Sequence, residues 1–363
     1  MKKKGSILSV SMLIVLFLAS ISISDYWAIQ PVTDNDLNDR FPNVSDGYIV
    51  WQGFDGNDWE IYIKSASGIE QITDNDVDDR YPVVSDNGYV VWEHYDGSDY
   101  EIFLYHHAGP SYYQITDNNY DDRSPNISDN GNFVVFTTVG KLYLYNFSTT
   151  TLITDDEGAG VFAMNPVVNN AGQIAWFADD SEYDYEIYLY DSSTILQITD
   201  NDFDDWHPAI SNAGEVVWYG YGELDASDIT ADAEIFYFAG GSIYQVTGND
   251  DSVDSAVDDT MPDIGDNGKI VWCTSNSEIF VHTYGSEGST YQLTHAADYI
   301  AASPSIAGIN SVVWSGIDTT PDDLLFDEEI FTDNWIETYI GDSDDGGSGS
   351  SGGGGCFITT AFN

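Results

Sequence analysis

Residues 82–92 read Pro-Val-Val-Ser-Asp-Asn-Gly-Tyr-Val-Val-Trp, and this stretch decides the fold. Two short apolar runs flank a Ser-Asp-Asn-Gly turn, in which asparagine and glycine adopt a positive φ at little cost, so the stretch predicts a β-hairpin. The same pattern, from a proline to an aromatic residue, occurs seven times, at 42–51, 82–92, 125–136, 166–176, 208–218, 262–272 and 304–314. The chain is therefore built from an internal repeat.

Two further landmarks recur in the repeats. A Glu-Ile-aromatic strand begins at Glu60, Glu101, Glu186, Glu234, Glu278 and Glu329, with Lys141 in a degenerate third copy. An apolar strand ends at Thr33, Thr73, Thr116, Thr154, Thr199, Thr247 and Thr294, spaced by 38 to 48 residues. A repeat of this length with four short strands is typical of a propeller blade. In the second repeat we expect strands at 82–84, 89–93, 101–105 and 112–116.

The two ends of the repeat region predict a closed ring. Residues 30–33, Gln-Pro-Val-Thr, match the fourth strand of other repeats, such as Glu-Gln-Ile-Thr at 70–73. The seventh repeat has no such strand after Phe331, so the N-terminal strand can complete the last blade and leave no open sheet edge. The fold class is therefore expected to be all-β, a seven-bladed β-propeller of four-stranded blades. An open β-solenoid would need shorter repeats and would not supply the missing strand.

The repeat carries a family resemblance. The succession Thr-Asp, Pro-x-Val-Ser-Asp-x-Gly-x-Val-Val-Trp and Asp-Gly-x-Asp-x-Glu-Ile-Tyr resembles the TolB-like (WD40-like, PD40) propeller repeat over roughly residues 25–340. The resemblance implies the propeller fold. Proteins with this repeat serve as protein-binding platforms, as companions of hydrolase domains and as cell-surface modules, so the repeat indicates a fold and not an activity.

The N-terminus predicts export. Three lysines at 2–4 precede an apolar run over 7–19, and small residues precede a cleavage point at Asp25, a pattern typical of a secretory signal. We expect a mature chain outside the cell or at the cell surface, without a transmembrane segment. The expected organisation is a signal peptide at 1–24, the propeller at 25–340, a Gly/Ser/Asp-rich linker at 341–355 and a sorting-type motif at 356–363.

The C-terminal tail carries a second resemblance. It is similar to a short sorting-type element of exported bacterial and archaeal proteins, in which Cys-Phe-Ile follows a run of glycines. Here Cys356 begins Cys-Phe-Ile after four glycines, and Thr-Thr-Ala-Phe-Asn replaces the usual Ala-Thr-Ala-Ala-Tyr. The resemblance implies that Cys356 is a point of processing, lipid attachment or covalent linkage. The alternative is a disordered end with an incidental cysteine.

Acidic residues dominate the composition. The chain has 62 Asp and Glu against 9 Lys and Arg, a formal charge of −53. So few basic residues cannot neutralise phosphates, which excludes nucleic acid as a partner, and an anionic membrane would repel the chain. An aromatic content of 14% argues against a disordered acidic chain. Sorting by expected strand order places about 47 of the 62 acidic residues in loops on one face, so the charge is directional.

The loops between blades predict a metal site. Oxygen-bearing side chains alternate along 34–39, 74–79, 117–122 and 200–205, a spacing that suits Ca²⁺. The candidate ligands are Asp34, Asp36, Asn38, Asp39, Asp74, Asp76, Asp78, Asp79, Asp117, Asn119, Asp121, Asp200, Asp202 and Asp204. Missing ligands could come from the carboxylates at 55, 58 and 60 or at 96, 99 and 101. The alternative is that the loops form solvated Asx turns without an ion.

The sequence has no recognisable catalytic constellation. The six histidines fall at unrelated repeat positions, and most carboxylates repeat with the blades, as scaffolding does. We therefore expect a chain that is not an enzyme, a non-catalytic binding or assembly module for a protein or cell-envelope ligand. The alternatives are an extracellular lyase or glycosidase acting in the central channel, and a halophilic surface protein without specific metal sites. An enzyme should show a non-repeating polar cluster where the blades converge.

Overall fold

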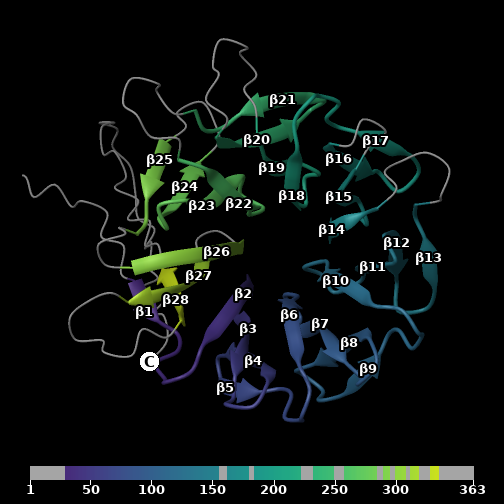
Figure 1. Cartoon of the computed structure of the whole chain (residues 1–363), viewed down its shortest axis with the longest axis vertical. Coiled ribbons are helices and arrows are strands. Elements are labelled where there is room, and N and C mark those ends of the chain that lie inside the picture. The colour runs from purple at the N-terminus through teal and green to yellow at the C-terminus, as the bar shows by residue number, and fades with distance from the viewer. Residues whose placement is uncertain are drawn as a thin grey trace, which may run out of the picture.

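The computed structural model describes residues 29–154, 162–179, 184–221, 232–248, 257–283, 289–294, 299–307, 311–318 and 328–334. These residues form seven four-stranded antiparallel sheets arranged in a ring (Figure 1). The predicted all-β, seven-bladed propeller is confirmed. No helix in the described part has the length and apolarity needed to span a membrane. The expected signal peptide, linker and Cys356 lie outside these residues.

The strands follow chain order from the centre of the ring outward. The first blade has β2 (Asp39–Ser45), β3 (Tyr48–Phe54), β4 (Trp59–Ser65) and β5 (Gly68–Gln71). The second has β6 (Asp79–Val84), β7 (Tyr89–Tyr95), β8 (Tyr100–His106) and β9 (Tyr112–Gln114). The third has β10 (Asp122–Ile127), β11 (Val134–Thr138), β12 (Lys141–Tyr145) and β13 (Thr150–Leu152). The fourth has β14 (Met164–Val168), β15 (Ile174–Asp179), β16 (Tyr185–Tyr190) and β17 (Ile195–Gln197).

The remaining blades repeat this order. The fifth has β18 (Asp205–Ile210), β19 (Val216–Tyr221), β20 (Ala233–Ala239) and β21 (Ser242–Gln245). The sixth has β22 (Asp259–Ile264), β23 (Lys269–Thr274), β24 (Ile279–Thr283) and β25 (Ser289–Gln292). The seventh has β26 (Tyr299–Ala307), β27 (Ser311–Asp318) and β28 (Glu329–Asn334), and its outermost strand is β1 (Ile29–Pro31).

The N-terminal strand closes the ring as predicted. β1 pairs antiparallel with β28, with Ile29 opposite Asp333 and Pro31 opposite Phe331. Beyond the paired residues, the N–H of Val32 donates to the carbonyl of Ile330 at 2.7 Å. The last blade is therefore made from both ends of the repeat region.

The repeated threonine has the same role in every blade. Its Oγ1 accepts the backbone N–H of the residue after the repeated glutamate, or after Lys141 in the third blade, at 2.8 to 3.0 Å. The pairs are Thr33–Ile330, Thr73–Ile61, Thr116–Ile102, Thr154–Leu142, Thr199–Ile187, Thr247–Ile235 and Thr294–Ile279. This bond joins the third strand to the chain leaving the fourth strand. A buried backbone donor needs such an acceptor, which explains why the repeat keeps threonine here.

The repeated tryptophans form the core between blades. Trp51, Trp92, Trp176, Trp218, Trp272 and Trp314 are all buried. Apolar residues of consecutive blades pack together, as Val50 and Ile61 of the first blade do with Val84 and Trp92 of the second. This aromatic column therefore belongs to the core between blades.

Candidate functional site

The loops between blades are organised by Asx turns. In four loops an asparagine accepts, through Oδ1, the N–H two residues further on at 2.8 Å, and donates through Nδ2 to an aspartate four residues on. These asparagines are Asn35, Asn75, Asn118 and Asn201. The backbone N–H of each asparagine also donates at 2.7 Å to the repeated glutamate of the blade that the chain has just left. The Asx-turn alternative therefore describes the backbone of these loops.

The last aspartate of each loop is buried, and in three of the four loops it accepts a hydrogen bond from a core tryptophan. Asp39 and Asp79, two of the predicted ligands, accept the indole N–H of Trp51 and Trp92 at 2.9 and 2.7 Å. Asp205 accepts the indole N–H of Trp218 at 2.8 Å in the same way. Burial raises the pKa of Asp39, and it raises the pKa of Asp205 to about 6. These carboxylates are directed toward core tryptophans and not toward an ion site in the solvent-exposed part of the loop.

A second set of predicted ligands caps the neighbouring strand. Asp78, Asp121 and Asp204 each accept, through Oδ1, the first N–H of the third strand of the preceding blade, at 3.0 to 3.2 Å. Asn38 does the same for the N–H of Glu328 at 3.1 Å. One oxygen of each side chain is thereby used to join consecutive blades.

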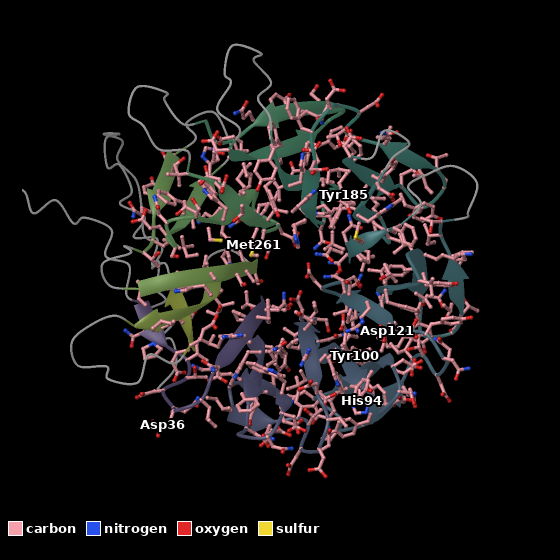
Figure 2. All side chains as sticks on the ribbon, viewed as in Figure 1. Asp36, His94, Tyr100, Asp121, Tyr185 and Met261 are labelled. Carbon is pink, nitrogen blue, oxygen red and sulfur yellow. The ribbon has the colours of Figure 1, made fainter. Side chains whose placement is uncertain are left out.

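The other predicted ligands are exposed. They are Asp34, Asp36, Asp74, Asp76, Asp117, Asn119, Asp200 and Asp202. Figure 2 shows Asp36 at the outer edge of the molecule, directed away from the ring. Within the described residues, only Asp74 of the whole predicted set belongs to a carboxylate group compact enough for one ion. The alternating spacing in the loops does not by itself bring ligands together.

The three arginines pair with carboxylates. Arg40 Nε lies 2.5 Å from Glu328 of the seventh blade, and Arg123 binds Glu93 of the second blade at 2.9 Å. Arg80 instead pairs within its own loop, with Asp78. Two of the three arginines therefore link consecutive blades.

A central channel runs between the first strands of the blades. It holds a cavity of about 340 Å³ lined by residues of all seven first strands or the turns that follow them. At the end away from the inter-blade loops, the side-chain amide of Asn212 donates to Asp129 and Asp266 at 2.8 and 2.7 Å. Burial raises the pKa of Asp129 to about 6. Side chains from three blades thus meet at this end of the channel.

The other end of the channel carries a ring of unusual backbone conformations. Every first strand has a register shift, a β-bulge, just before its central proline. The residue before that proline has a φ between 44° and 54°, although none is glycine. We call these seven residues the channel rim: Phe41, Tyr81, Ser124, Asn165, His207, Met261 and Ser303. In the first six blades, the first strand begins one or two residues before the rim residue. The rim therefore lies next to the inter-blade loops.

Neighbouring side chains of the channel rim touch. The rings of Phe41 and Tyr81 lie 4.8 Å apart, and Ser303 Oγ lies 4.0 Å from Met261 Sδ. Phe41, Tyr81 and Met261 are 37%, 42% and 41% exposed, so this side of the rim is apolar and open to solvent. Figure 2 shows Met261 beside the centre of the ring.

The opposite side of the channel rim is polar. Ser124 Oγ donates to Asn165 Oδ1 at 3.4 Å, and Asn165 Nδ2 donates to His207 Nδ1 at 2.8 Å. His207 stacks on Tyr219 with a centroid distance of 5.7 Å, and burial lowers its pKa. This is a non-repeating polar cluster where the blades converge, which the sequence did not identify. The only signal was the variable residue before each repeated proline.

The similarity of the chain to known proteins lies in its fold. No protein-family model matches the sequence, and no curated protein is similar to it. An oligogalacturonate lyase from Vibrio parahaemolyticus matches at 10% identity over 86% of this chain and 94% of its own, with a TM-score of 0.59. A virginiamycin B lyase from Staphylococcus aureus matches at 12% identity over 86% of this chain and 99% of its own, with a TM-score of 0.56. The acylaminoacyl peptidase of Pyrococcus horikoshii matches at 10% identity over 82% of this chain and 51% of its own, with a TM-score of 0.58.

These similarities correct one expectation. The prediction that the chain is not an enzyme is wrong, because the similar propellers are mostly enzymes, lyases and peptidases among them. Repetition of carboxylates along the blades was a poor reason to exclude catalysis, since the channel rim does not repeat. At 10 to 12% identity the match concerns the fold alone, so the reactions of those proteins are not assigned to this chain. The resemblance to the TolB-like repeat likewise holds at the level of the propeller fold.

Proposed function

We propose that the chain is an exported propeller at the cell surface that binds a ligand at its channel rim. The observation that carries the proposal is a ring of seven equivalent backbone positions with unlike side chains. At other repeated positions the fold fixes the residue type, as with the threonine acceptor and the core tryptophan. At the channel rim the backbone repeats and the side chains do not, so the fold does not require these particular side chains.

The conformation of the rim is costly. A non-glycine residue with positive φ is strained by roughly 1 kcal/mol or more, and such residues cluster at binding sites and active sites. Three exposed apolar side chains, those of Phe41, Tyr81 and Met261, gather in this strained ring. Exposed apolar groups collected at one mouth are typical of a surface that contacts a ligand.

The charges suggest the chemistry of the ligand. None of the seven rim side chains is acidic or basic, apart from His207, whose lowered pKa keeps it neutral at pH 7. The loops around the rim are acidic. A ligand should therefore present an apolar group to the rim and positive charge to the surrounding carboxylates, and a basic segment of a protein partner has both features.

The binding test uses synthetic peptides of equal length that carry leucine flanked by arginine, serine or glutamate. The rim variant is Phe41→Asn, Tyr81→Asn and Met261→Asn, because asparagine tolerates positive φ. The control replaces Ile69, Tyr113 and Leu196, exposed residues of the fourth strands, by asparagine. We expect the arginine peptide to bind the parent and the control, and to bind the rim variant at least roughly tenfold more weakly. Equal binding to the rim variant, or equal binding of the glutamate peptide, would contradict the proposal.

A second candidate function is catalysis at the same rim. The hydrogen-bonded row Ser124, Asn165 and His207 supports it, because Asn165 fixes the imidazole with its proton on Nε2. With Nδ1 accepting from Asn165, the Nε2–H group can donate a hydrogen bond to a negative charge that develops on a substrate oxygen. Product analysis after incubation with peptides and with oligosaccharides tests this function. Turnover that His207→Gln abolishes would support it, and turnover that survives His207→Gln would contradict a role for this residue.

The cofactor that we propose for the acidic face is Ca²⁺, and the attachment point that we propose is Cys356. Thermal unfolding in chelator, Ca²⁺ and NaCl at matched ionic strength separates ion binding from screening. A rise in melting temperature specific to Ca²⁺ supports bound ions. For attachment, Cys356→Ser should release the protein into the medium, and unchanged cell association in fractionation would contradict that role.

A further inference from the structure

Two hairpins on the side of the inter-blade loops contain the same turn. One joins β3 to β4 and the other joins β7 to β8. In both, Oδ1 of the first aspartate, Asp55 or Asp96, accepts the N–H groups two and three residues further on, at 2.8 and 3.2 Å. The turn uses this one oxygen and leaves the other oxygen of the aspartate for a further ligand.

Buried carboxylate oxygens without a hydrogen-bond partner lie beside these turns. Glu60 and Glu101 are 0% exposed. Oε1 of each accepts a backbone N–H at 2.7 Å, but Oε2 of each has no partner among the described residues. Asp58 is 7% exposed, and neither of its carboxylate oxygens has a hydrogen-bond partner among the described residues. A buried carboxylate in this state is costly unless positive charge reaches it.

The buried glutamates belong to two compact carboxylate groups. Oxygens of Asp55, Glu60 and Asp74 lie within 4.8 Å of one another. Oxygens of Asp96, Asp99 and Glu101 lie within the same distance of one another. In each group the glutamate is buried and the first aspartate is exposed, so the group is fixed on the protein side and open to solvent on the other.

The arginines of the chain do not neutralise these groups. All three pair elsewhere: Arg40 with Glu328, Arg80 with Asp78, and Arg123 with Glu93 and Asp121. A cation or a proton from solvent can supply the positive charge that would stabilise the buried oxygens. Three carboxylates that converge on one point favour a cation with several oxygen ligands.

The open geometry of the groups favours a particular cation. Ca²⁺ binds oxygen ligands at 2.3–2.6 Å, so two ligands of one ion lie at most about 5 Å apart, and the oxygens here meet that limit. Mg²⁺ binds at 2.0–2.1 Å and requires a nearly ideal octahedron of ligands. Ca²⁺ also accepts irregular geometry and additional waters, which suits a site that is open on one side.

We propose that each group binds one Ca²⁺ ion, with Asp55, Glu60 and Asp74 as ligands of the first ion and Asp96, Asp99 and Glu101 as ligands of the second. The inference rests on the Ca²⁺ part of the proposed function. It moves the sites from the alternating loop residues to the hairpins, where only Asp74 comes from a loop between blades. The first ion therefore ties the β3–β4 hairpin to the segment that enters the second blade.

The test measures Ca²⁺ bound per chain by equilibrium dialysis of the complete protein, in NaCl of constant ionic strength. The variant Glu60→Gln with Glu101→Gln keeps the size of both side chains and removes their charge. It should lose both proposed ions. The control, Asp36→Asn with Asp76→Asn, removes the same charge from exposed loop residues outside both groups and should keep them.

A second variant addresses folding. Asp74→Asn with Asp96→Asn changes only exposed residues, and it should weaken binding at both sites while the far-ultraviolet circular dichroism stays that of the parent. If the glutamine variant is folded and binds as much Ca²⁺ as the parent, or if the loop control loses as much, the site assignment is overturned. If the parent binds no Ca²⁺, the Ca²⁺ part of the proposed function fails as well. Ligand binding at the channel rim is measured separately and does not depend on either result.

Discussion

Replacing Thr33 by valine tests whether the N-terminal strand closes the ring. Valine has nearly the shape of threonine but cannot accept a hydrogen bond. Thr33 Oγ1 accepts the N–H of Ile330 at 2.9 Å, and both residues are buried. The substitution leaves this N–H without an acceptor, which costs about 1–3 kcal/mol for a buried group. We expect the free energy of unfolding to fall by that amount.

The assay is urea denaturation followed by tryptophan fluorescence, with two comparisons. Thr73→Val removes the equivalent bond to Ile61, within a blade made from one continuous segment, and should cost a similar amount. Thr33→Ser keeps the acceptor and should lose less than about 1 kcal/mol. If Thr73→Val destabilises and Thr33→Val does not, β1 does not complete the seventh blade in solution and the closure described above is refuted.

Two further predictions concern the buried aspartates that bind tryptophan. A Cβ at Gly220 would lie 2.0 Å from Asp205 Oδ1, so Gly220→Ala should displace the acceptor of Trp218 and destabilise by about 1–3 kcal/mol in urea denaturation. Gly109→Ala, where the nearest atom is 3.6 Å away, should have little effect, and equal effects would contradict the clash. Burial raises the pKa of Asp205 and of Asp259 to about 6 from 3.8. Their contribution to stability is therefore full below about pH 4 and is lost as the pH rises through about 6, by roughly 3 kcal/mol each. Urea midpoints in chelator should fall between pH 5 and 7.5, and Asp205→Asn should flatten the dependence; a rising midpoint would contradict this sign.

Much of the fold could be predicted because each repeated residue has a local physical reason. The tryptophan fills the space between blades, the threonine accepts one buried N–H, and residues 30–33 supply a strand that the last repeat lacks. The same logic explains two exceptions. The fourth and seventh blades have Ala163 and Ala301 where the first, second, fifth and sixth blades have the tryptophan-binding aspartate. The indole N–H of Trp176 and of Trp314 has no partner among the described residues.

The candidate sites were harder to predict for two different reasons. Spacing identifies carboxylates but does not say which oxygens are already used. Asp78 caps a strand and Asp79 binds an indole, whereas Glu60, read from the sequence mainly as a strand marker, keeps a buried oxygen without a partner. The channel rim escaped a search for repeats because its side chains differ from blade to blade. Its positive φ depends on a bulge that forms only when the first and second strands pair.

The positions of bound Ca²⁺ test most directly the role proposed for the carboxylate groups of the two hairpins. The measurement is an anomalous difference map from a crystal of the protein grown with Ca²⁺. The account predicts one peak about 2.3–2.6 Å from carboxylate oxygens of Glu60 and a second at the same distance from Glu101. Peaks confined to the alternating aspartates of 34–39 and 74–79, or no peak in crystals saturated with Ca²⁺, would contradict it.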